Sequence, residues 1–193
     1  MEEKKDKGVQ TRDTGSDEPT YVARARRGDK GAFGMLVRMH QQRLLRMVLG
    51  MVGDVDSAMD VVQESFVRAY QALERFDESQ PFYPWLSTIA THLALNQIKR
   101  SRRETGLDDR MTERATDDPD PLAKLQAEES DQRFLAAVQE LPDQYRTVFV
   151  LRNFDDLSYE AIAARLGISV GTVDSRLFRA RRLLVEKLKD LLE

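Results

Sequence analysis

The chain of 193 residues contains no cysteine. This absence excludes disulfide bonds, zinc sites built from thiolates, and catalysis or redox sensing by a thiol. It also fits a reducing compartment, and we expect the protein to be cytoplasmic. Long apolar runs are missing as well, since no stretch approaches the roughly 20 residues that a membrane-spanning helix requires. Residues 1–18 are polar, so the sequence predicts neither a secretory signal nor membrane insertion.

Candidate catalytic groups are scarce. The two histidines, His40 and His92, lie neither in a metal-binding repeat nor beside a nucleophile, and the ten glycines form no phosphate-binding loop. We therefore expect no enzyme activity, no metal and no cofactor. Strand signals are nearly absent, whereas apolar residues recur at helical spacing over long stretches. The sequence predicts an all-α protein.

The composition changes along the chain and predicts two small helical domains. Residues 1–19 are polar and predict a disordered tail. Helical patterns fill residues 20–103 and return over 131–193. Between 104 and 131 lie ten acidic residues against three basic ones, with Pro119 and Pro121. Such a composition buries too little apolar surface to order its backbone, so we expect residues 104–130 to be a flexible acidic linker.

The segment 157–182 predicts two short helices joined by a tight turn. Ser158 is placed to cap the first helix, Gly167 to end it, and Ser169 to cap the second. Apolar residues at helical spacing share one face of the second helix: Val173, Leu177, Ala180 and Leu184. Residues that face away from this stripe or lie at its edge carry hydroxyl or guanidinium groups: Thr172, Ser175, Arg176, Arg179 and Arg182.

This pattern is typical of a helix-turn-helix, in which the second helix lies in the DNA major groove. Small hydroxyl residues allow close approach to bases, and arginines contact phosphates. Residues 170–189 hold six basic and two acidic side chains, a local charge of +4 in a chain whose net charge is −3. Binding must therefore come from such patches. An ordinary helical hairpin with a solvated polar face is the alternative, and Ala161 stands where a capping box would have Glu or Gln.

A second candidate site lies in the first domain, where Phe82, Tyr83 and Trp85 precede a basic cluster. The cluster consists of Lys99, Arg100, Arg102 and Arg103. Exposed rings that stack on unpaired bases, beside cations that follow phosphates, suit single-stranded DNA. The alternative is that Phe82 and Trp85 are core residues at a helix start and that the basic cluster is a solvated helix end.

Together these segments resemble the extracytoplasmic-function (ECF) sigma factors, the two-domain initiation subunits of bacterial RNA polymerase. Residues 60–70, DVVQESFVRAY, are similar to the family's helix that binds the clamp helices of the beta-prime subunit. The resemblance implies that this helix contacts core polymerase through Asp60, Val61, Gln63, Glu64, Phe66 and Arg68. Acids near its start, such as Asp54 and Asp56, also favour the helix by themselves.

Residues 82–90, FYPWLSTIA, are similar to the family's part that melts and reads the −10 element. The resemblance implies −10 contacts from Phe82, Tyr83, Trp85, Asn96, Lys99, Arg100, Arg102 and Arg103. Segments 141–142, 151–152, 157–163 and 170–181 resemble the second domain, which sits on the beta-subunit flap and reads the −35 element. There the implied DNA-binding residues are Ser169, Gly171, Thr172, Ser175, Arg176, Arg179 and Arg182. The resemblance further implies an anti-sigma protein as a partner.

Two positions depart from the family pattern. Asp174 stands where the family usually has Lys or Arg. An acid there either removes a phosphate contact and repels the DNA backbone, or accepts from a cytosine amino group, or forms an ion pair within the chain. His92 stands where Asn is common, so no base-reading role is assigned to it. The alternative function is a stand-alone helix-turn-helix regulator with a helical effector domain, which would bind paired half-sites as a dimer. The chain has no heptad run long enough for an obvious dimer seam.

Overall fold

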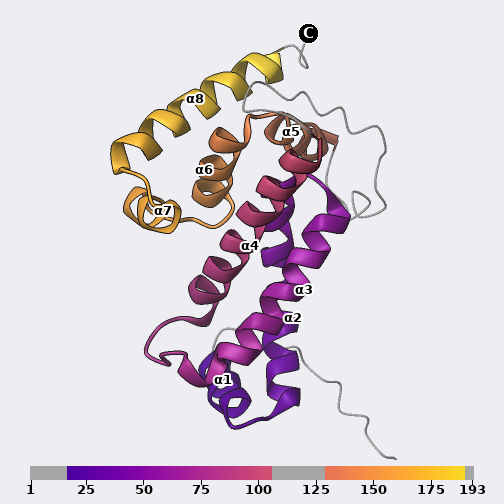
Figure 1. Cartoon of the computed structure of the whole chain (residues 1–193), viewed down its shortest axis with the longest axis vertical. Helices are drawn as coiled ribbons and strands as arrows, with labels where there is room; N and C mark the ends of the chain where they lie inside the picture. Colours follow the sequence, from indigo (N-terminus) through magenta and orange to yellow (C-terminus); the bar gives the residue numbers. More distant parts are fainter. Residues whose placement is uncertain (1–16, 106–128, 190–193) are drawn as a thin grey trace, which may run out of the picture.

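The computed structural model of the chain describes residues 17–105 and 129–189 (Figure 1). These residues form eight α-helices and one short 3₁₀ helix and contain no strand, which confirms the all-α prediction. The first domain contains α1 Glu18–Arg26, α2 Lys30–Val52, α3 Val55–Ala72, η1 Leu73–Arg75 and α4 Phe82–Thr105. The second contains α5 Glu129–Gln139, α6 Asp143–Asn153, α7 Tyr159–Leu166 and α8 Val170–Lys189. Most of the expected tail and linker lies outside the described residues. No described helix combines the length and the apolar character needed to cross a bilayer.

The first domain is built on α2, α3 and α4, which pack against one another in every pairing. Aspartates start two of these helices: Asp29 accepts from the backbone N–H of Ala32 at 3.0 Å, and Asp54 accepts from that of Ser57 at 2.8 Å. Gly53, at a φ of 80°, ends α2 in the left-handed conformation that glycine adopts without strain. The core between them is apolar, with fully buried Leu36, Leu44, Met47, Met51, Ala58, Leu86 and Ala90.

In the second domain α8 packs on α6 and α7. Ser158 accepts from the N–H of Ala161, and Ser169 accepts from that of Thr172, each at 3.1 Å. Gly167 ends α7 with a φ of 65°. The apolar stripe expected on the second helix is buried: Val173, Leu177, Ala180 and Leu184. The caps, the turn and the buried face of the helix-turn-helix are therefore confirmed.

The two domains pack against each other. Helix α2 contacts both α5 and α6, and Figure 1 shows the second domain, in orange and yellow, against the end of the first domain where α2 finishes. Gly50 permits this close approach, because a Cβ atom there would lie 3.0 Å from side-chain atoms of Val150 and of Phe154. Arg146 crosses the boundary and donates from Nε to the carbonyl oxygen of Met51 at 2.9 Å. That carbonyl is in the last turn of α2, where carbonyls lack helical partners.

Candidate nucleic-acid and polymerase interfaces

The outward side of α8 carries most of the residues that the sequence predicts for −35 binding. Ser169, Gly171, Ser175, Arg179 and Arg182 are exposed, while Thr172 and Arg176 are half-buried. We call these seven residues the −35 surface. Ser169 caps α8, and the other six residues lie within this helix. The turn at Gly167 and the cap at Ser169 fix where α8 begins, and so they fix the position of the whole surface.

Hydrogen bonds within the second domain hold parts of the −35 surface in place. The hydroxyls of Ser169 and Thr172 lie 2.8 Å apart, and Ser175 donates to the carbonyl oxygen of Thr172 at 3.0 Å. Arg179 donates to the hydroxyl of Tyr145 at 3.1 Å, and this hydrogen bond raises the pKa of the guanidinium. The surface therefore presents fixed hydroxyls at the helix start and a permanent positive charge farther along.

Two exposed residues of α8 stand beside the −35 surface. Asp174 is exposed, and it makes no ion pair with any residue of the described ranges. Phe178 is 66% exposed, although it is a large apolar side chain. The sequence analysis missed Phe178. Its position outside the stripe from Val173 to Leu184 was the available signal, since an aromatic residue off the buried face has no packing role within the helix pair.

The start of α4 differs from what the sequence predicts for a single-strand surface. The rings of Phe82 and Tyr83 are only 1% and 6% exposed, so the expectation that they are available for stacking on bases is wrong for this arrangement of the chain. Phe82 packs against Phe76 and Trp85, with ring centroids 5.8 and 5.7 Å away. Helix α4 starts at Phe82, and the backbone of its first turn directs the side chains of Phe82 and Tyr83 towards the core. Phe82 is therefore a core residue at the helix start, as the alternative interpretation of this segment predicted. Trp85 is half-buried.

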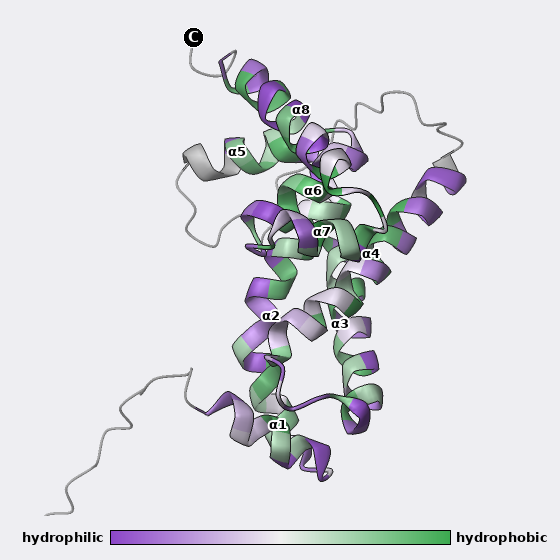
Figure 2. Ribbon diagram, turned by 90° about the vertical axis from the view of Figure 1, so that its left-hand side faces the viewer, coloured by the Kyte–Doolittle hydropathy of each residue, from purple (hydrophilic) through white to green (hydrophobic). Residues whose placement is uncertain are grey.

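The other end of α4 is hydrophilic, as Figure 2 shows in purple. Asn96, Lys99, Arg100 and Arg103 are exposed. The Nε atom of Arg100 lies 2.8 Å from Glu104, and this pairing raises the pKa of Arg100. Arg102 is half-buried, and its Nε lies 2.6 Å from the carboxylate of Asp143 in the second domain. We call Trp85, Asn96, Lys99, Arg100, Arg102 and Arg103 the −10 surface. One of its arginines, Arg102, is thus engaged by the second domain.

Helix α3 carries the residues predicted for core polymerase. Asp60, Gln63, Glu64 and Arg68 are exposed, and Arg68 pairs with Glu64 at 2.7 Å. Val61 and Phe66 are buried at 6% and 7% exposure, so they support the helix more than they offer surface.

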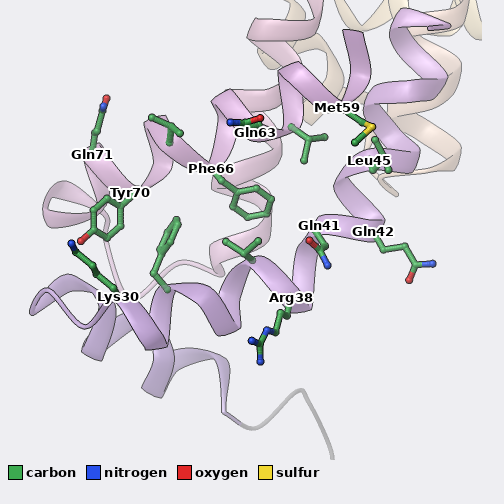
Figure 3. Close-up of a pocket in the computed structure, with 14 residues that line it drawn as sticks. Lys30, Arg38, Gln41, Gln42, Leu45, Met59, Gln63, Phe66, Tyr70 and Gln71 are labelled. Atoms are coloured by element: carbon green, nitrogen blue, oxygen red, sulfur yellow. The ribbon is translucent and has the colours of Figure 1, made fainter. Parts of the chain in front are cut away.

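An open groove of about 870 Å³ lies between α2 and α3 (Figure 3). Its apolar walls come from both helices: Phe33, Val37, Leu45, Met59, Val62, Phe66, Val67 and Tyr70. Met59, at 52% exposure, Val67 and Tyr70 are the exposed members. The sequence analysis missed these three residues. The signal was a second apolar stripe on α3 at spacings of three and four, in addition to the stripe that enters the core.

No three histidine or acidic side chains of the described residues come together as metal ligands would. The described residues thus present three surfaces. Helix α8 has an exposed side with hydroxyl groups and arginines, α4 has a basic end, and α3 borders an apolar groove with acidic residues beside it. These surfaces lie on different helices of two domains.

Comparisons with known proteins agree with this division. Residues 36–104 match the family model of sigma-70 region 2, and residues 131–184 match that of sigma-70, region 4. The chain is 37% identical over 180 residues to the RNA polymerase sigma-H factor of Pseudomonas aeruginosa, covering 89% of this chain and 93% of that protein. It is 34% identical over 179 residues to the ECF RNA polymerase sigma factor SigW of Bacillus subtilis, covering 88% and 96%.

Among solved structures, the sigma factor RpoE in complex with the anti-sigma factor NepR from Bartonella quintana superposes with a TM-score of 0.65. The two chains are 26% identical, over 81% of this chain and 96% of that one. A stand-alone regulator is not favoured, because the first domain matches a sigma region where that alternative requires an effector domain. The chain belongs to the ECF family of RNA polymerase sigma factors.

Proposed function

We propose that this chain directs core RNA polymerase to specific promoters and helps to melt the −10 region during initiation. The observation that carries this proposal is the −35 surface, an exposed row of hydroxyl and guanidinium groups on a helix-turn-helix with a fully buried core. Phe178 belongs with it, since a phenyl ring beside major-groove residues can contact a thymine methyl group. Working on polymerase places the protein in the cytoplasm, and binding by positioned surfaces requires no catalytic group.

We assign the α2–α3 groove and the exposed acids of α3 to the clamp helices of the beta-prime subunit. An apolar groove is the usual seat for the apolar face of a partner helix. Asp60 and Glu64 beside it suit a partner with basic residues. The second domain would bind the beta flap. With two contacts on one polymerase, modest separate affinities combine through effective concentration. By analogy with the relative whose structure contains an anti-sigma factor, we also propose such a protein as a regulator.

Transcription by purified components tests the proposed function. The wild-type chain is expected to give promoter-specific transcripts only when core polymerase is added. Specific duplex binding and promoter selection without core polymerase would instead support the stand-alone regulator.

The groove is tested by Val67→Asp, which places a charge among its exposed apolar residues. We expect Val67→Asp to lose most of its binding to core polymerase in a pull-down or anisotropy measurement. Val185→Asp is the matched control, because Val185 is similarly exposed, at 53% against 44%, but lies on α8. Wild-type core binding by Val67→Asp would remove the groove from the proposed interface.

A further inference from the structure

Helix α8 carries apolar side chains on its exposed side as well as in its buried stripe. Six large apolar residues of the described ranges are exposed, and three of them border the α2–α3 groove. The other three all belong to α8: Val170 at 42% exposure, Phe178 at 66% and Val185 at 53%. Single exposed apolar residues are ordinary on a protein surface, whereas several on one side of one helix indicate a contact.

These three residues lie on the same side of α8. An α-helix turns by about 100° per residue, so residues three, four and seven positions apart lie close to one line along it. Val170, Asp174, Phe178, Arg181 and Val185 follow one another at spacings of four, four, three and four. We call these five residues the α8 flank. It is about 22 Å long at a rise of about 1.5 Å per residue.

Nothing in the described part of the chain covers the α8 flank. All five residues are exposed, and neither Asp174 nor Arg181 forms an ion pair within residues 17–105 and 129–189. Helix α8 packs on α5, α6 and α7 of its own domain, and Figure 1 shows it, in yellow, along the outer edge of that domain. The flank is therefore free to meet another molecule.

The flank is complementary to itself. Along it an apolar residue, an acid, a phenyl ring, a base and an apolar residue follow one another. When two copies of α8 run in opposite directions about a two-fold axis, Val170 of each copy faces Val185 of the other, and Asp174 faces Arg181. Both pairs come into register together, because each is centred on the same point of the helix, beside Phe178.

Charge also selects the direction of the pairing. A parallel pair of flanks would place Asp174 opposite Asp174 and Arg181 opposite Arg181, and such like-charge pairs oppose association. The antiparallel pair turns both into attractive pairs on either side of two neighbouring Phe178 rings. An aromatic residue at the centre of a contact, with polar residues around it, is the usual arrangement of a binding hot spot.

We propose that the α8 flank is a docking surface for a second copy of this chain, which binds antiparallel through the same flank. The pairing covers Phe178 and places a helix beside Ser175 and Arg182, so a paired α8 cannot enter a major groove. This masking of the −35 surface rests on the proposed function, whereas the pairing itself does not. DNA leaves part of the flank unexplained, because Asp174 repels phosphates and Val185 lies about two turns beyond Phe178, away from the helix start that approaches the bases.

The dimer is expected to be weak. Five side chains from each copy are far fewer than the roughly 20–30 residues that each partner contributes to a stable interface. A contact of this size suits a dissociation constant of about 10 μM to 1 mM. The free chain is then a monomer when it is scarce and pairs as it accumulates.

Sedimentation equilibrium of the full chain over a concentration series measures the pairing. The wild type should pass from monomer to dimer, and Phe178→Ser, which removes the central ring, should stay monomeric. Val185→Ser should weaken the association. Val67→Ser makes the same change at a similarly exposed valine of α3 and should not weaken it. A wild-type chain that is still monomeric at about 1 mM would overturn the proposal. A loss in Val67→Ser without a loss in Val185→Ser would overturn it too, by assigning the contact to the groove.

Reversal of single charges tests the antiparallel register. Asp174→Arg leaves two cations on the flank and Arg181→Asp leaves two anions, so each variant should pair with itself about tenfold more weakly than the wild type. Mixed in equal amounts, the two variants should pair with each other, because every facing pair then joins an arginine to an aspartate. Arg182→Asp is the control, since it makes the same change of charge beside the flank and should not restore pairing with Asp174→Arg. No restoration by Arg181→Asp, or equal restoration by Arg182→Asp, would overturn the antiparallel contact.

Duplex DNA that contains the −35 element tests the masking. Added to wild-type chain at a concentration at which it pairs, the duplex should convert dimers into complexes of one chain with one duplex. A dimer that binds the duplex and remains paired through α8 would overturn the masking. The pairing is measured without DNA or polymerase, so its failure is distinct from a failure of core-dependent transcription. Circular dichroism checks that each variant keeps its helices.

Discussion

Helices α4 and α8, which carry the −10 surface and the −35 surface, have different surroundings. Each is amphipathic and carries a run of arginines on its polar side. The polar side of α8 is largely exposed, because α8 packs on α5, α6 and α7 of its own domain through its apolar side. The first turns of α4 are covered on one side by the core and on another by Arg165 of the second domain. Whether a basic, aromatic segment is accessible to a ligand therefore depends on the parts of the fold that pack against it.

The largest expected effect comes from the α7 residue that covers the start of α4. Arg165→Met removes the principal partner of the buried Asp155, and an unpaired buried charge of this kind costs about 3–5 kcal/mol. Separation of the domains would rehydrate Asp155, so this figure is the upper end of the expected loss. Urea unfolding measures it. Arg181→Met, on an exposed cation of α8, is expected to change stability by less than about 0.5 kcal/mol. Equal losses would mean that α4 is as open as α8.

The next largest effect concerns the support of the open helix. Leu177 is fully buried beneath the −35 surface, so Leu177→Ala should lower the free energy of unfolding by about 2–5 kcal/mol. Val185→Ala, on the exposed side of α8, should change it by less than about 0.5 kcal/mol. Thermal unfolding of the two variants gives the difference. A small loss for Leu177→Ala would show that the α8 surface does not depend on its buried stripe.

The open surface is then tested directly. Arg179→Ala and Arg182→Ala should each weaken binding to duplex containing the −35 element, by about 1–3 kcal/mol for a contact bidentate to guanine. Arg181→Ala makes the same change of charge beside the −35 surface and should cost less. Anisotropy titrations at fixed salt measure all three. If Arg181→Ala costs as much as the others, binding depends on charge alone and the geometry of the surface is irrelevant.

The smallest expected effect is a pH dependence of the stability of the first domain. His40 of α2 is buried beside Glu18 and Arg43, and burial, the dominant influence, lowers its pKa below the usual 6.5. The unfolded chain then binds the proton first, so stability is fully present above pH 6.5 and falls as pH drops below that value. The loss amounts to about 1.4 kcal/mol for each unit by which the pKa is lowered.

Unfolding measured at a series of pH values checks the slope. His40→Gln should remove this loss. His92→Gln removes an exposed imidazole and should keep it. A slope that survives in His40→Gln would assign the pH dependence to other groups.

Periodicity and capping rules were sufficient for the helix-turn-helix. Ser158, Gly167 and Ser169 act on backbone groups within a few residues, and the stripe from Val173 to Leu184 packs on elements next to it in the chain. These caps and this buried stripe depend on local geometry, which is determined by residues close together in the sequence. Phe82, Tyr83 and Arg102 were different. Their surroundings come from α2 and from Asp143, far away in sequence, and no spacing within one helix contains that information.

By itself the sequence determined an all-helical chain, the caps and turn of the second domain, and which side of α8 is exposed, because helix formation and amphipathic packing depend on neighbouring residues. Only the tertiary structure decided that two aromatic rings of α4 face inwards, that Met59, Val67 and Tyr70 border a groove with α2, and that Arg165 and Asp155 pair where the two domains meet. The physical reason is desolvation. Whether a side chain meets water, a partner or its own chain is set by what packs over it, and in this protein that is either another helix of the same domain or the other domain.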